Sequence, residues 1–201
     1  MRIYEWISLS LLCFFGAISP GPSLIVILNS AINYGKKASL FACIGHGLGI
    51  FIYAFTVTII LKNLYTEYEN IILIIRILGS AFLIYLGIKL IIKKNNSNFT
   101  TKKNGENFIN GFLISILNPK VIFFFLSVFG QFVNKENSIL LNFKMALIAA
   151  FIDIFVYVSF VMIIFYVFKI ENFLKFIYSI NFVSGIFLII LGALLLMIKI
   201  Y

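Results

Sequence analysis

Residues 19–22 read Ser-Pro-Gly-Pro and lie inside an apolar stretch that runs from Ile7 to Leu28. A stretch of this length can cross the ~30 Å hydrocarbon core of a bilayer as a helix. Because proline removes a backbone donor and clashes with the preceding turn, we expect the helix to break at Pro20, Gly21 and Pro22. The carbonyls before such a break and the N–H groups after it predict a local site for an ion or a carboxylate.

Five further apolar stretches follow, so the sequence predicts six membrane-spanning helices. They are Ala38 to Leu61, Ile71 to Ile92, Phe108 to Val133, Phe143 to Phe168 and Ile180 to Ile200. The composition agrees, because 62% of the 201 residues are hydrophobic and 11% are charged, which is outside the usual range of soluble domains. The sequence therefore predicts an all-α integral membrane protein with one transmembrane domain over residues 1–201 and no separate soluble domain.

The two halves of the chain resemble each other. Phe82 to Gly87 and Phe187 to Gly192 share five of six residues at an offset of 105. Ile50 to Tyr53 resembles Ile154 to Tyr157 at an offset of 104. Two matches at nearly one offset predict an internal repeat.

The repeat has a topological consequence. Repeat 1 covers residues 1–92, a polar loop covers 93–107, and repeat 2 covers 108–201. Because each repeat holds three spans, the second must be inserted upside down, as in secondary transporters that bind substrate near the midplane. Nine Lys and Arg residues lie on the side of the first, third and fifth connections and five on the other side. This bias predicts that 93–107 is cytoplasmic and that both termini are external.

A second helix break is predicted in the fourth span, where residues 118–120 read Asn-Pro-Lys. Asn118 can bond to backbone groups that Pro119 frees. Lys120 places a charge at a depth where insertion costs ~2.5–3.5 kcal/mol, which indicates a partner or gating role unless its long stem snorkels to the interface. We expect the breaks in the first and fourth spans to approach each other across a pseudo-twofold axis in the membrane plane.

Three more side chains are candidates for chemistry. Asp153 is the only acidic residue inside an apolar stretch, and such a carboxylate marks a substrate or proton path unless it belongs to a purely structural ion pair. Tyr157, one turn later, either offers a hydroxyl to a substrate or packs as an aromatic ring. His46 is either a proton-relay group or a packing residue, while its neighbours Gly45 and Gly49 predict a close helix contact. The sequence thus assigns substrate binding to Pro20, Gly21, Pro22, Asn118, Pro119, Lys120, Asp153 and Tyr157, and proton coupling to Asp153 and His46.

Five short motifs occur together in this sequence and form two groups. Pro-Gly-Pro at 20–22, the segment 33–40 and Gly-His-Gly-Leu-Gly at 45–49 form the first group, and Asn-Pro-Lys at 118–120 with Gln-Phe at 131–132 forms the second. This set resembles the LysE/RhtB amino-acid exporter family over practically the whole chain, with Gly130 where the family carries proline. The resemblance implies a six-span protein of the bacterial inner membrane that exports amino acids or close analogues, driven by proton motive force.

Two other functions compete with amino-acid export. Related branches of the superfamily export metal cations such as cadmium, but a metal site needs a cluster of ligands, and Asp153, His46, Cys43 and Cys13 are spread over three spans. A membrane thiol-redox carrier would use the two cysteines as an exchanging pair, and both lie in apolar sequence. We therefore expect a transporter and no enzyme, with no cofactor, no resident metal and no nucleic-acid partner. Its partners are then a small-molecule substrate and the lipid bilayer, and a homo-oligomer stays open.

Overall fold

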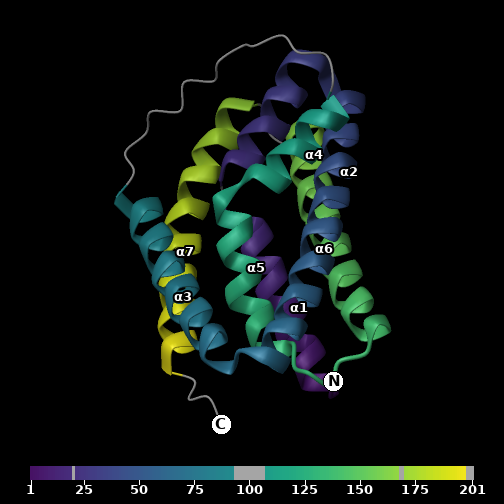
Figure 1. The fold of residues 1–201 in the computed structure, drawn as a ribbon. Helices are drawn as coiled ribbons and strands as arrows, with labels where there is room; N and C mark the ends of the chain where they lie inside the picture. The colour runs from purple at the N-terminus through teal and green to yellow at the C-terminus, as the bar shows by residue number, and fades with distance from the viewer. Residues whose placement is uncertain (20, 93–106, 168–169, 198–201) are drawn as a thin grey trace.

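The computed structural model describes residues 1–19, 21–92, 107–167 and 170–197, and every regular element in these ranges is an α-helix (Figure 1). In chain order they are α1 (Ile3–Ile18), α2 (Pro22–Glu67), α3 (Glu69–Ile92), α4 (Asn107–Leu117), α5 (Pro119–Phe132), α6 (Ile139–Tyr166) and α7 (Ile170–Met197). The predicted all-α class is confirmed. Of the expected polar loop at 93–107, only Asn107 lies among the described residues, and it begins α4.

The helices have the length and composition of membrane spans. Within the described ranges, α2, α3 and α6 are long and apolar enough to cross a bilayer. A fourth crossing results if α4 and α5, which are bent by 55° at the break between them, count as one broken span. α1 and the segment Phe182–Leu194 of α7 are also apolar but shorter. The chain is therefore a helical membrane protein.

Gly35 divides α2 into two parts. Its φ of 83° lies in the left-handed region that favours glycine. A straight helix of 46 residues would be ~70 Å long, more than twice the hydrocarbon core. Figure 1 shows the chain running upward through α1 and the start of α2 and then back down through the rest of α2. Residues 29–34, which hydropathy places in a connection, are thus helical, and the turn is confined to Gly35.

Close packing of α2 against α4 depends on glycines. A Cβ added at Gly45 would meet the backbone oxygen of Phe108, and a Cβ at Gly111 would meet the backbone oxygen of Ala42. A Cβ at Gly49 would also meet α4. The close helix contact predicted for Gly45 and Gly49 is confirmed, and α4 is its partner.

We expect Gly111→Val to lower the thermal stability of the protein. The added side chain would press on the backbone of α2, which cannot move as a side chain can, and overpacking of this kind costs ~1–3 kcal/mol. The midpoint of thermal unfolding in detergent is the measurement. Leu113→Val on the exposed face of the same helix is the control and should leave the midpoint nearly unchanged. Equal midpoints for the two variants would contradict the packing argument.

α3 and α7 lie side by side along one flank of the bundle (Figure 1). A Cβ at Gly87 would meet Gly185 and Ile189 of α7, at 2.6 and 2.7 Å. A Cβ at Gly192 would meet Ser80 and Ile84 of α3, each at 2.7 Å. Since later residues of one helix face earlier residues of the other, the two helices are antiparallel.

α6 has one face turned outward and one turned inward. Phe151 and Phe155, four residues apart, are 64% and 66% exposed. Asp153 and Tyr157 lie on the other side of the helix and are buried. Large exposed aromatic side chains suit a face that contacts lipid, so the acidic residue points into the bundle.

Candidate functional site

Two helix breaks lie next to each other inside the bundle. α1 gives way to extended backbone at Ser19, and α2 begins at Pro22. α4 ends before Asn118, which has extended backbone and caps α5 at Pro119. Both predicted interruptions are confirmed, whereas Pro20 lies outside the described residues.

Side chains from the second break reach the first. Lys120 Nζ donates to the backbone oxygen of Gly16 (3.0 Å) and to that of Ser19, which are among the last carbonyls of α1. Asn118 Nδ2 donates to Ser23 Oγ (2.9 Å) in the first turn of α2, and Asn118 Oδ1 accepts from the Lys120 amide (3.0 Å). Lys120 therefore does not snorkel, because its Nζ group satisfies carbonyls that the break has freed.

Asp153 and His46 form a buried pair. Asp153 Oδ2 lies 2.6 Å from His46 Nδ1, and the two residues are 5% and 1% exposed. Tyr157 packs edge-to-face on the imidazole, with ring centroids 4.8 Å apart. The other ring nitrogen of His46, Nε2, is buried and has no hydrogen-bond partner in the part of the chain that the structure describes.

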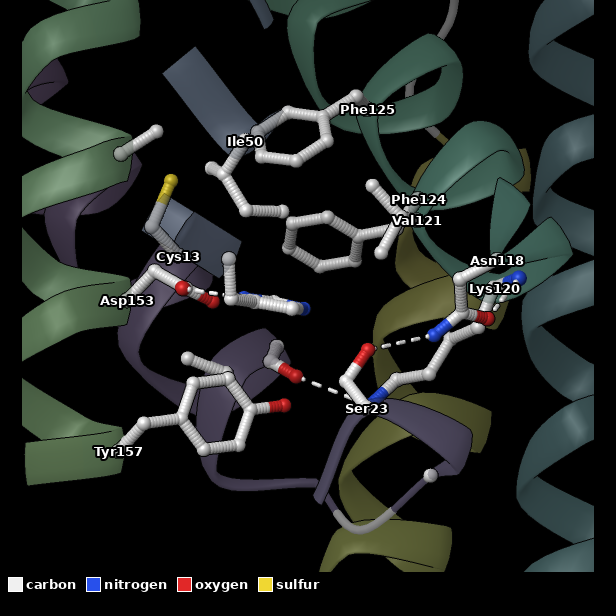
Figure 2. A pocket seen from close by; sticks show the side chains of 15 residues that line it. Cys13, Ser23, Ile50, Asn118, Lys120, Val121, Phe124, Phe125, Asp153 and Tyr157 are labelled. Carbon is white, nitrogen blue, oxygen red and sulfur yellow. Dashed lines mark hydrogen bonds and ion pairs between the residues drawn. The ribbon is translucent and has the colours of Figure 1, made fainter. Parts of the chain in front are cut away.

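The two breaks and the buried pair line one partly open cavity, and its empty space of about 450 Å³ includes its opening to the surroundings. In Figure 2, Asp153 and Tyr157 lie on one side of it, and Asn118 and Lys120 lie on the other. The remaining wall is apolar and consists of Cys13, Ala17, Ile50, Val121, Phe124, Phe125 and Ala149, with Gly16, Gly21 and Ser23 near the first break.

The apolar wall and Ser23 were not assigned to the site from the sequence. Val121, Phe124 and Phe125 follow the i, i+3, i+4 spacing of one helix face, which could have marked them as one inward surface. Ser23 carries no such signal, because a serine in the first turn of a helix is common for local reasons. Of the described residues of the predicted site, Gly21, His46, Asn118, Lys120, Asp153 and Tyr157 line the cavity, whereas Pro22 and Pro119 begin α2 and α5 beside it and do not line it.

The cavity has two chemically different poles. Near the breaks it presents N–H donors, namely Lys120, Asn118 and the first turn of α2, which has no side-chain cap and so leaves backbone N–H groups for an anion. At the other pole lie the carboxylate of Asp153, whose oxygens accept hydrogen bonds, and the imidazole of His46. Such a cavity can hold a small molecule with a carboxylate at one end and an ammonium at the other.

A resident metal would need a different set of ligands. The described ranges contain no group of three or more His, Cys, Asp or Glu side chains that could hold a metal ion. Cys13 and Cys43 are buried and unpaired with each other.

Known proteins resemble the chain at the level of sequence. A family model described as LysE type translocator matches residues 14–199. The uncharacterized membrane protein YrhP of Bacillus subtilis (strain 168) is 28% identical over 137 residues, which is 61% of this chain and 64% of the relative. The uncharacterized membrane protein YahN of Escherichia coli (strain K12) is 26% identical over 141 residues, which is 67% of this chain and 62% of the relative. The leucine efflux protein of Salmonella typhimurium (strain LT2) is 29% identical over 125 residues, which is 60% of this chain and 59% of the relative.

The alignments are partial, since the chain covers between 59% and 64% of the length of these relatives. No solved structure matches the chain.

Proposed function

The chain belongs to the LysE type translocator family, and from this membership we propose that it is a secondary transporter that exports amino acids or close analogues from the cytoplasm by proton antiport. The observation that carries the proposal is the cavity inside the bundle, where donors at two broken helices lie across from the pair of His46 on α2 and Asp153 on α6. One relative is named a leucine efflux protein, which supports an amino acid as substrate.

The proposed architecture is a single transmembrane domain of six spans in two inverted repeats, residues 1–92 and 108–201. The spans are α1 with the start of α2, the rest of α2, α3, α4 with α5, α6, and α7. The contact between α3 and α7 supports the repeat. Gly87 and Gly192 are 105 residues apart. Gly87 faces Gly185 and Ile189, and Gly192 faces Ser80 and Ile84, which precede those two residues by 105 positions each. Reciprocal contacts between antiparallel helices are what a two-fold axis perpendicular to them produces.

The substrate is proposed to lie across the cavity with its carboxylate toward the breaks. There it would accept hydrogen bonds from the first turn of α2, after Gly21 and Pro22, and from Lys120. Its ammonium would lie toward Asp153 and His46, with Tyr157 beside them. The apolar wall leaves space for an aliphatic side chain, which suits neutral amino acids better than basic ones because a second ammonium would meet Phe124 and Phe125.

Proton coupling is assigned to the pair of Asp153 and His46. The pair changes its charge by one when it gains a proton, and a substrate ammonium interacts more strongly with the deprotonated form. Protons entering from outside then favour release of substrate, and release of the proton inside favours binding of substrate.

Survival and substrate content of cells test the function. Cells that express the protein should become resistant to toxic amino acids or their analogues and should hold less of them. Cells that express the Lys120→Met variant at the same level are the control. Resistance to cadmium alone, with unchanged amino-acid content, would contradict the proposal and favour a metal exporter.

The proposed location is the bacterial inner membrane, with the loop at 93–107 cytoplasmic and both termini external. Single cysteines at positions 96 and 201 test this orientation in a background without Cys13 and Cys43. A membrane-impermeant thiol reagent should label Tyr201→Cys in intact cells and Asn96→Cys only after permeabilisation. The reverse pattern would show that the lysine count predicts the wrong orientation.

A further inference from the structure

We infer that His46 Nε2 is the atom at which the proton and the substrate ammonium exchange, and that Asp153 is a positioning residue for the imidazole. This inference rests on the proposed function and assigns its coupling step to one atom. The sequence alone assigns proton coupling to both side chains, and Asp153 stands out there because it is the only acid within an apolar stretch.

The two nitrogens of His46 lie in different surroundings. Nδ1 contacts Asp153 Oδ2 at 2.6 Å, whereas Nε2 is buried without a partner among the described residues. The residue is 1% exposed and lines the cavity. A buried polar atom without a hydrogen bond costs ~1–3 kcal/mol, and native structures retain few of them. A ligand in the cavity would supply the missing partner.

The contact with Asp153 fixes which nitrogen is available. Two acceptors repel each other at 2.6 Å, so a proton lies between Nδ1 and the carboxylate. With Asp153 ionised, Nδ1 carries that proton and Nε2 offers a lone pair. Nε2 can then accept a hydrogen bond from the ammonium of the substrate.

Because both use the lone pair of Nε2, the proton and the substrate ammonium cannot be bound there at the same time. A proton that binds Nε2 converts the imidazole to an imidazolium, and the net charge of the pair rises from −1 to zero. The substrate ammonium then loses both its acceptor and the negative charge, and it leaves. Loss of the proton to the other compartment restores the lone pair, so one proton moves for each substrate molecule.

Other titratable groups near the ring do not replace it in this step. The groups from every neighbouring element are Asp153 and Tyr157 of α6, Lys120 of α5, Cys13 of α1 and Cys43 of α2 itself, while α4 has no titratable side chain. Asp153 is the only acid among them, and Lys120 is bonded to the end of α1. Histidine is also the side chain whose charge changes most readily near neutral pH.

Nitrogen-15 NMR of the histidine ring tests the inference directly. The sequence contains a single histidine, so a histidine label reports on His46 alone when the protein is purified through a tag without histidine. With the full-length protein in lipid nanodiscs, Nδ1 should stay protonated while Nε2 titrates. Saturating leucine, the probe, should lower the proton affinity of Nε2 about tenfold. A proton that titrates at Nδ1, or an Nε2 signal that leucine leaves unchanged, would overturn the assignment.

Transport by His46→Gln and His46→Asn gives a second test. Neither amide titrates, so leucine export from proteoliposomes driven by a pH gradient should fall more than about tenfold in both. Leucine counterflow needs no net proton movement and should fall less in His46→Gln, whose amide oxygen reaches the position of Nε2. Ser80→Ala is the control, because Ser80 Oγ is also buried and unpartnered among the described residues but lies between α3 and α7.

The outcomes separate the inference from the proposed function. Wild-type protein that shows no counterflow with leucine or with any other amino acid would contradict the exporter itself. Active wild-type protein together with a His46→Gln variant that keeps gradient-driven export would overturn only the role of Nε2.

Discussion

Lys120→Met is expected to abolish export and to destabilise the protein. Methionine keeps the length and much of the volume of the side chain but cannot donate to the carbonyls of Gly16 and Ser19. Each buried carbonyl left without its partner costs ~1–3 kcal/mol, and the substrate carboxylate loses a donor. Gradient-driven efflux from proteoliposomes and the midpoint of thermal unfolding are the two measurements.

Lys144→Met is the matched control, because Lys144 on α6 is exposed. It should leave both the midpoint and the efflux close to those of the wild type. If Lys120→Met folds with a wild-type midpoint and still exports, neither the bonds across the breaks nor the donor role of Lys120 matters for function. A folded variant that binds substrate normally would contradict the donor role alone.

Asp153→Asn should reduce gradient-driven export more than about tenfold at neutral pH. Asparagine keeps the volume and can still accept a hydrogen bond from His46 Nδ1. It removes the negative charge that attracts both the proton and the substrate ammonium to the pair. Export should therefore recover in part as the external pH is lowered, because the titrating imidazole is still present. Efflux measured across a series of external pH values is the test.

Glu136→Gln makes the same chemical change at an exposed acid and should leave the pH profile unaltered. Expression of each variant in the membrane is measured separately. Loss of export at every pH in Asp153→Asn would place the exchanging proton on the carboxylate. Unchanged export at neutral pH would leave Asp153 with a purely structural role.

The helix breaks could be predicted from the sequence because their cause is local. Proline at 22 and 119 lacks a donor wherever the chain runs, and Asn118 precedes the second break as a capping residue does. The glycine contact of α2 was also predictable, since Gly45 and Gly49 are spaced by one helical turn. Local rules did not place the turn at Gly35, because residues 29–34 continue the helix although hydropathy assigns them to a connection.

The partners within the site could not be predicted. His46 and Asp153 are 107 residues apart, and their contact depends on how α2 and α6 are rotated and shifted against each other. The partners of Lys120 are backbone oxygens. Every residue has such an oxygen, so the sequence does not indicate which of them accept from Lys120. The only acidic side chain that the sequence offers within an apolar stretch is Asp153, which is not the hydrogen-bond partner of Lys120.

The hydrogen bonds between the two breaks also constrain how the protein can move. Lys120 and Asn118 connect the second broken span both to the end of α1 and to the beginning of α2. If either broken helix slid along its axis, these bonds would have to stretch or rupture together. The two broken spans, α1 with the start of α2 and α4 with α5, therefore move together. A transport cycle that keeps these bonds has to tilt both spans as one rigid body against the neighbouring helices.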